Sequence, residues 1–218
     1  DLSSHKAISK IKEEALAFWL TFPHKFSHAV YNHDATGDYV YFAKNSKDIY
    51  FAGGVEDSRY CQLLTLSGTK NAYDYTLWGN AAQRVYEGMI IGEGADNVRF
   101  SFGVWPNAQD IEYSLTTLSS SHMFGCANIR NKKYCILNKQ YTKEEYEKLR
   151  TKIIEDMNAK PYRDKVGRTY AYGEFFPPEL SLFGYNETYA AAFFPLTEGE
   201  AVKKGFSWHE AQANTYTP

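Results

Sequence analysis

The densest set of possible metal ligands lies near the N-terminus, where three histidines and two aspartates follow one another closely. They are His24, His28, His33, Asp34 and Asp38. Imidazole nitrogens and carboxylate oxygens bind many divalent metals. His24 and His28 are four residues apart and could share one face of a helix, whereas the residues before His33 have extended character. We therefore take His24, His28, His33 and Asp34 as candidate metal ligands, with solvated histidines in a turn as the competing interpretation.

The cysteines predict no metal or redox site. Cys61, Cys126 and Cys135 are odd in number and form no CxxC pair, so the chain offers no zinc knuckle. We expect buried, reduced thiols. A Cys126–Cys135 disulfide is the alternative, and it requires adjacent strands. No glycine-rich phosphate loop occurs either, so we predict no cofactor.

Other residue types give no catalytic constellation. Ser119, Ser120, Ser121 and His122 adjoin in sequence, but neighbours on a strand point to opposite faces, so they do not form a hydrolase triad. The predicted strands also carry charged residues, namely Glu56, Asp57, Arg59, Arg84, Glu87, Arg99, Asp110 and Glu112. The acids do not recur at one repeat position. A solvated face is therefore favoured over a row of catalytic or calcium-binding carboxylates.

These residues lie in a stretch, 46–137, that repeats itself. Ala72, Val85, Val98 and Ile111 follow one another at intervals of 13 residues. Each lies in a short run of alternating apolar and aromatic residues, which is typical of a strand, and turn residues separate the runs. A fixed period indicates a stacked solenoid. Because 13 residues look too few to enclose a core, we expect roughly 25 residues per coil of a parallel β-helix. An antiparallel sandwich is the alternative.

Composition limits the class of protein. The 218 residues suit one domain with appendages, and 44% hydrophobic residues suffice for a core. The net charge of −2 provides no global basic field for nucleic acid. The chain has no apolar run of 18 residues and no signal-peptide pattern, so we expect no membrane association, and a cytoplasmic location is slightly favoured. The first residue, Asp1, suggests a processed product or an excerpt of a longer chain.

Two helices are expected to flank the solenoid. Residues 4–22 have an apolar stripe that includes Phe18 and Trp19, and Pro23 stops the helix. We expect this helix to cap the open first coil, with a partner-binding helix as the alternative. Thr142 and Glu145 form a capping box that begins the second helix, which is expected to be the other cap.

The fold class predicted is all-β with flanking helices. The expected divisions are a capping helix at 1–23, the solenoid at 24–141, a helix at 142–158 and a tail at 159–218. The tail is aromatic and proline-rich and should pack along the solenoid. Its expected anchors are Phe175, Phe176, Phe183, Phe193 and Phe194. Asp34–Tyr39 is expected to be a tight turn in which Gly37 takes positive φ.

Three long segments carry a resemblance to a family. They are residues 22–51, 124–149 and 173–208. They resemble uncharacterised asparagine- and cysteine-rich repeat proteins that are common in candidate-phyla bacteria. The resemblance implies a β-solenoid, a cysteine ladder within the repeat and zinc ribbons on both sides of it. Here most ladder cysteines are replaced, the zinc ribbons are absent, and Tyr31–Asp34 departs from the usual Asn-Asn-Glu-Asn. The resemblance therefore implies architecture but no catalytic residue.

We expect a non-enzymatic structural or binding module that presents a long surface to a macromolecular partner. The candidate contact residues are Trp78, Trp105, Tyr113, Phe18 and Trp19. The partner would be a protein or, by family analogy alone, a nucleic acid. The alternatives are a carbohydrate-active β-helix enzyme and a self-assembling or virion component. The sequence leaves the oligomeric state open.

Overall fold

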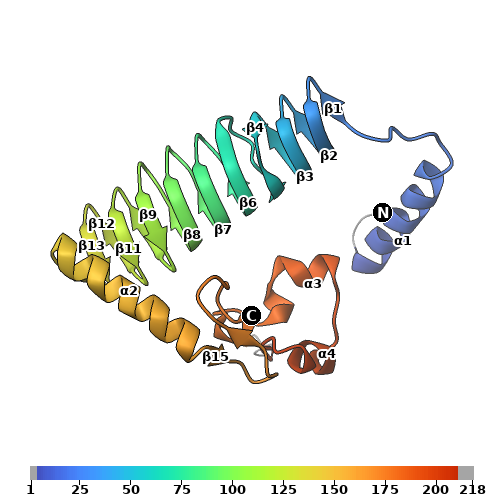
Figure 1. Ribbon diagram of the computed structural model, residues 1–218. Helices are drawn as coiled ribbons and strands as arrows, with labels where there is room; N and C mark the ends of the chain where they lie inside the picture. Colours follow the sequence, from blue (N-terminus) through green and yellow to red (C-terminus); the bar gives the residue numbers. More distant parts are fainter. Residues whose placement is uncertain (1–3, 211–218) are drawn as a thin grey trace, which may run out of the picture.

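A computed structural model describes residues 4–210, and a β-solenoid of about eight turns dominates it (Figure 1). The predicted fold class is therefore confirmed. Its strands are β1 (Ala29–Val30), β2 (His33–Tyr41), β3 (Lys44–Gly53), β4 (Val55–Glu56), β5 (Arg59–Gln62), β6 (Thr69–Trp78), β7 (Gln83–Ile91), β8 (Asp96–Val104), β9 (Gln109–Glu112), β10 (Leu115–Leu118), β11 (Ser121–Phe124), β12 (Ala127–Arg130), β13 (Lys133–Ile136) and β14 (Lys139–Gln140). Neighbouring coils pair in parallel, and the last strand, β14, pairs antiparallel with β13.

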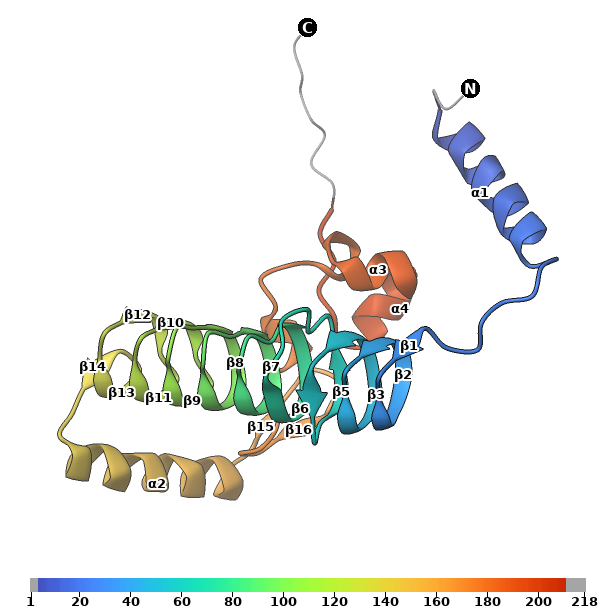
Figure 2. The same cartoon turned by 90° about the horizontal axis from the view of Figure 1, so that it is seen from above.

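The predicted coil length is wrong. Ala72 pairs with Val85, Val85 with Val98 and Val98 with Ile111, so each of these coils takes 13 residues instead of roughly 25. The interval seen in the sequence is one complete coil. Figure 2 shows the coils as narrow rungs stacked side by side.

The coil can be this short because its backbone turns at every third residue. Along one coil, Asp110, Tyr113, Thr116, Ser119 and His122 all have positive φ, between 45° and 56°. Each such residue makes a corner, so a coil has four sides of about three residues. The left-handed conformation costs roughly 1–2 kcal/mol for most residues but is easier for Asn and Asp. Asparagine and aspartate accordingly recur at one corner, as Asn45, Asp57, Asn71, Asn97 and Asp110.

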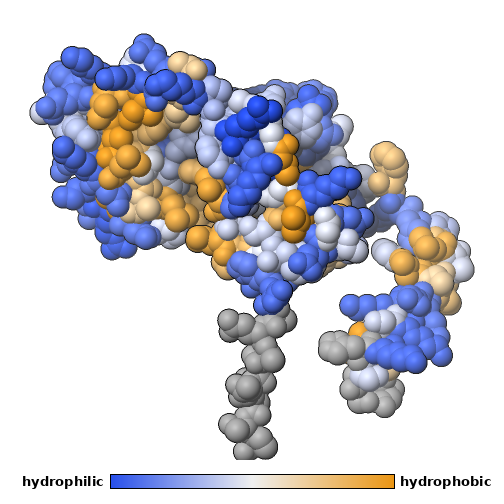
Figure 3. All heavy atoms as spheres, turned by 90° about the horizontal axis from the view of Figure 1, so that it is seen from below, coloured by the Kyte–Doolittle hydropathy of each residue, from blue (hydrophilic) through white to orange (hydrophobic). Residues whose placement is uncertain are grey.

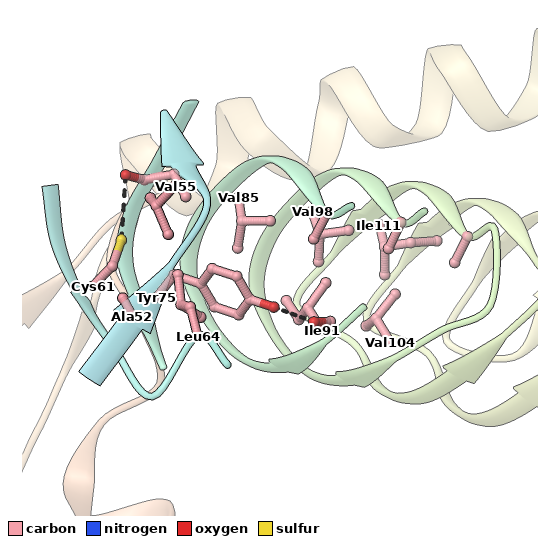
Figure 4. Packing of buried hydrophobic residues seen from close by; sticks show 14 of the residues in the cluster. Ala52, Val55, Cys61, Leu64, Tyr75, Val85, Ile91, Val98, Val104 and Ile111 are labelled. Carbon is pink, nitrogen blue, oxygen red and sulfur yellow. Dashed lines mark hydrogen bonds between the residues drawn. The ribbon is translucent and has the colours of Figure 1, made fainter. Parts of the chain in front are cut away.

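The core consists of inward-facing rows, one on each side of the coil (Figure 4). One row is aliphatic, a second ends in small polar residues, a third is mixed and a fourth is nearly all alanine. The aliphatic row includes Ala72, Val85, Val98, Ile111 and Met123, and the second row includes Cys61, Tyr75, Ser101, Ser114 and Cys126. The mixed row includes Ile91, Val104 and Thr117, and the alanine row includes Ala82, Ala95, Ala108 and Ser120. The small side chains in two rows let opposite walls approach closely, which keeps the coil narrow.

The N-terminal helix does not cap the solenoid, contrary to prediction. Helix α1 (His5–Trp19) begins after its N-cap, Ser4, whose side chain accepts a hydrogen bond from the Ala7 N–H. Figure 1 shows the helix set apart from the strands, and Figure 3 shows hydrophobic residues at its surface. Phe18 and Trp19 are 68% and 61% exposed. An amphipathic pattern predicts that an apolar face can be covered, but it does not specify the covering element.

The second helix, α2 (Lys143–Ala159), begins with the predicted capping box of Thr142 and Glu145. It lies along the side of the last coils and not across their end (Figures 1 and 2). Its buried Tyr146 packs in one cluster with Phe124 and Ile136. The antiparallel strand β14 follows the last parallel strand, so the stack ends in a hairpin.

The tail contains the hairpin β15 (Tyr162–Arg163) and β16 (Thr169–Tyr170), then the 3-10 turns η1 (Pro178–Leu180) and η2 (Tyr185–Glu187), and the short helices α3 (Tyr189–Phe193) and α4 (Glu198–Lys203). Phe176 contacts the solenoid through Tyr113, as predicted for the anchors. The predicted anchors Phe183, Phe193 and Phe194 are largely exposed instead. The tail has a small apolar centre of its own, in which Tyr185 packs on Phe206. Some of its aromatic side chains therefore pack against one another and not on the solenoid.

Gly37 takes positive φ as expected, but not in a tight turn. It lies within β2 at a bulge, where φ is +133°. A Cβ atom there would overlap the carbonyl oxygen of Ile49 on the next coil. No helix among residues 4–210 is both long and apolar enough to cross a membrane.

Candidate functional site

The structure does not bring the candidate metal ligands together. The His28 ring lies 3.2 Å from a carboxylate oxygen of Asp38 and stacks on Tyr39. Asp34 pairs with Lys47. Within residues 4–210, no group of three or more His, Cys, Asp or Glu side chains is arranged to hold a metal ion.

The three cysteines are buried, reduced thiols, as predicted. Their role is visible at Cys126, which continues a ladder of buried serines. Ser114 donates from Oγ to the Glu112 carbonyl (2.8 Å) and accepts from the Cys126 N–H (3.0 Å). Cys126 repeats this pattern with the Phe124 carbonyl (3.6 Å) and the Asn138 N–H (3.5 Å). These side chains satisfy backbone groups at the coil corners, and burial raises the pKa of the Cys126 thiol.

Serine should therefore replace Cys126 with little loss of stability, whereas alanine should not. We expect Cys126→Ser to change the free energy of unfolding by less than about 1 kcal/mol, because a hydroxyl makes the same two bonds. Cys126→Ala should lower it by about 1–3 kcal/mol, because the Asn138 N–H loses its acceptor. Urea denaturation of both variants measures this difference. Equal stability of the two variants would contradict the ladder role.

Ser120 belongs to the same kind of ladder and not to a hydrolase site. Its hydroxyl donates to the Leu118 carbonyl (2.8 Å) and accepts from the Lys132 N–H (3.2 Å). His122 lies on the outer surface, where its ring stacks on Tyr134. The rejection of a triad in this segment agrees with the geometry.

The predicted contact residues divide into three groups. Trp78 and Trp105 are half-buried and pack edge to face, with ring centroids 5.6 Å apart. Tyr113 is covered by the tail, because its ring contacts Phe176 and its hydroxyl donates to the Glu174 carbonyl (3.1 Å). It is therefore an internal contact residue and not part of a free partner surface. Phe18 and Trp19 are exposed, which fits the alternative of a partner-binding helix.

A larger candidate surface lies on one side of the solenoid, where two adjacent outward rows contain no charged residue over seven coils. We call these rows the uncharged strip. They are Tyr50, Gln62, Thr76, Met89, Phe102, Leu115 and Ala127, and Phe51, Leu63, Leu77, Ile90, Gly103, Thr116 and Asn128. The strand register of the first row places its members directly above one another. Six spacings of about 4.8 Å make the strip about 29 Å long.

The strip is open to solvent although helix α2 and part of the tail pack against other sides of the solenoid. Six residues of the strip expose more than a third of their surface, namely Tyr50, Phe51, Leu63, Met89, Phe102 and Leu115. The opposite side of the coils is polar and carries cross-coil pairs such as Lys70 with Glu56 (2.9 Å) and Asn45 with Asp57 (3.1 Å). The two sides thus differ sharply in character.

A second candidate is a buried ionic cluster where α2 and the tail meet the solenoid. Glu112 is only 2% exposed. It accepts hydrogen bonds from Arg150 Nε (2.6 Å) and Nη2 (2.9 Å) and from the Tyr172 hydroxyl, and it pairs with Arg99 (3.0 Å). Burial by itself would raise the pKa of Glu112, but the hydrogen bonds from Arg150 and Tyr172 and the positive charges outweigh it and lower that pKa.

The solvated face predicted for the charged residues is therefore wrong for Glu112, which joins three segments of the chain. Comparison with known proteins adds no candidate, since no family model, curated protein or solved structure matches this chain. Two features were missed in the sequence: the Glu112 cluster and the uncharged strip. A search with a period of three would have revealed the strip, because its residues immediately follow one buried row. Arg99 lies one coil before Glu112, but Arg150 and Tyr172 lie 38 and 60 residues away and leave no local signal.

Proposed function

We propose that this protein is a non-enzymatic binding module whose uncharged strip docks against an apolar surface of a protein partner. One observation carries the proposal: exposed Tyr, Phe, Leu and Met side chains recur along the two rows of the strip, and the residues between them, such as Gln62 and Thr76, carry no charge. Contiguous exposed apolar patches of this kind are typical of protein interaction sites. The rigid stack fixes their spacing before the partner arrives, which lowers the entropic cost of binding.

The chemistry of the strip favours a protein over a nucleic acid. Nucleic-acid binding draws most of its affinity from lysine and arginine side chains that neutralise phosphates. The strip has neither from Tyr50 to Asn128. Its aromatic and aliphatic side chains instead match the centre of a protein interface, from which charged residues are depleted.

The enzyme alternative finds no support in Glu112. Glycoside hydrolysis needs a carboxylic acid whose pKa is raised so that it can donate a proton. Glu112, a deeply buried carboxylate, has a lowered pKa and is held by two arginines and a tyrosine. Such a carboxylate anchors structure and is not placed to donate a proton.

Two charges placed on the strip should abolish docking. We expect the double variant Leu63→Asp, Met89→Asp to weaken partner binding by about 100-fold or more, because each position replaces apolar contact with an unpaired, desolvated charge. Gln83→Asp, Gln109→Asp is the matched control, since it adds the same charge on the polar side. Circular dichroism should confirm that both variants are folded.

The partner can be captured with a photoreactive phenylalanine analogue at Phe102, with the same analogue at Gln109 as control. Exposed to an extract of its source, the protein should crosslink through position 102 to one defined protein, at an apolar segment of that protein. An excess of unlabelled protein should compete, and an excess of the Leu63→Asp, Met89→Asp variant should not. Crosslinks from position 102 to RNA, or only to a second copy of this chain, would contradict the proposal.

A further inference from the structure

A cavity of about 350 Å³ lies on another side of the solenoid, between the outer faces of three successive coils and helix α2. The coils contribute Asn97, Asp110 and His122, among others, and the helix contributes Glu147 and Thr151. This volume is at the lower end of the range of about 300–1,000 Å³ found for ligand sites. The cavity is separate from the uncharged strip, so a ligand bound in it is independent of the proposed function.

The walls of the cavity are polar but nearly balanced in charge. All nine lining residues, Tyr146 included, carry a polar group on the side chain. Arg99 and Arg150 are opposed by Asp110, Glu112 and Glu147, so the lining has a net charge of −1 when His122 is neutral. An anionic ligand would face the carboxylates, and a cationic ligand would face the guanidinium groups. A neutral ligand with both donors and acceptors avoids both conflicts.

The side chains that line the cavity are held in place before any ligand arrives. Asn97 Nδ2 donates to Asp110 Oδ1 (2.5 Å), and the His122 ring lies 3.5 Å from the other oxygen of Asp110. Arg99 and Arg150 are both fixed by Glu112. The Nε of Arg99 is buried and has no hydrogen-bond partner among residues 4–210. The rest of the Arg99 side chain is about one-third exposed and lines the cavity.

We propose that this cavity binds a neutral, hydroxyl-rich small molecule of the size of one or two sugar residues. Sugar hydroxyls both donate and accept, so they can accept from the guanidinium groups of Arg99 and Arg150 and donate to Asp110 in the same complex. Tyr146 and His122 add ring surface at the wall. Preorganised polar groups of this kind lose little freedom on binding.

The test uses the full chain with a defined panel: glucose, galactose, mannose, N-acetylglucosamine, maltose and cellobiose, each up to about 10 mM by saturation-transfer NMR. Inorganic phosphate and spermidine serve as charged probes. At least one sugar should bind, and neither charged probe should bind more tightly. Thr151→Trp, at an exposed position of α2, should block the cavity and abolish the signal. Asp110→Asn should weaken binding about tenfold or more, because a charged acceptor is lost.

Asp96→Asn is the matched control, because Asp96 pairs with Arg84 outside the cavity lining. It should leave sugar binding unchanged. Absence of binding by every sugar in the panel to the folded wild-type protein would overturn the proposal. So would sugar binding that survives Thr151→Trp, or tighter binding of phosphate or spermidine. Loss of partner docking in the strip variant would not affect any of these results.

Discussion

Replacing Tyr75 by alanine is expected to lower the free energy of unfolding by about 3–5 kcal/mol, the largest effect of any single substitution proposed for this chain. Tyr75 is fully buried and is the largest side chain inside the coils (Figure 4). It is followed in its row by Gly88, where a Cβ atom would lie 2.5 Å from Cδ1 of Ile91. Because Gly88 has no side chain, the next coil supplies none in this row to fill the space.

Tyr75→Phe separates packing from hydrogen bonding. The Tyr75 hydroxyl donates to the Ile91 carbonyl and accepts from the Gly79 N–H (3.0 Å). Phenylalanine keeps the ring but leaves both backbone groups unpaired, so we expect a loss of about 1–3 kcal/mol. Tyr73→Ala is the control on the same strand, because Tyr73 is about half exposed, and it should cost less than about 1 kcal/mol. Equal effects of Tyr75→Ala and Tyr73→Ala in urea denaturation would contradict this packing.

Removing Glu112 should cost about 3 kcal/mol, the second largest effect. Glu112→Ala leaves Arg99 and Arg150 without their buried partner, and breaking a buried ion pair costs about 3–5 kcal/mol. We expect the low end because both guanidinium groups are partly exposed and can be hydrated. The substitution should also loosen α2 and residues 172–176, so limited proteolysis should cut the tail sooner. The control is Glu147→Gln, on the helix that carries Arg150. It removes only the exposed pair of Glu147 with Lys143 and should cost less than about 0.5 kcal/mol.

The same cluster predicts a dependence of stability on pH. The pKa of Glu112 is lower in the folded chain than in the unfolded chain. The unfolded value is about 4.3. The contribution of Glu112 is thus fully present above about pH 4.3 and is lost as pH falls through the folded pKa. Between neutral pH and about pH 3 the wild-type protein should lose more stability than Glu112→Gln. Parallel pH profiles would show that Glu112 is not held ionised by its partners.

The sequence predicts the strands and the solenoid because their signals are local and repeated. The pairing of Ala72, Val85, Val98 and Ile111 follows from their interval, and the capping box at Thr142 marks the start of α2. The predicted coil length is wrong because 13 residues look too few to enclose a core when each strand has the ordinary period of two. The actual period is three, since bulky residues such as Tyr39, Phe51 and Leu63 adopt positive φ. Propensity alone disfavours that conformation, and only the stacking of coils stabilises it.

The candidate surfaces were less predictable because they depend on packing between distant segments. Tyr113 looked like a free aromatic, but the tail covers it. Glu112 looked solvated, but a helix and the tail supply its partners. The placement of α1 was also beyond reach, because its apolar stripe fits a cap and a partner surface equally well. The strip itself was recoverable, since absence of charge along a period-three row is a property of the sequence.

Purification of the wild-type protein and the Leu63→Asp, Met89→Asp variant from the native source tests the docking proposal most directly. Quantitative mass spectrometry identifies the proteins that accompany each, and absorbance at 260 nm reports nucleic acid. We predict one protein that accompanies the wild-type chain in defined stoichiometry and is lost with the variant, without excess absorbance at 260 nm. Nucleic acid that co-purifies equally with both chains, or the same protein retained by both, would contradict the assignment of the strip as the docking surface.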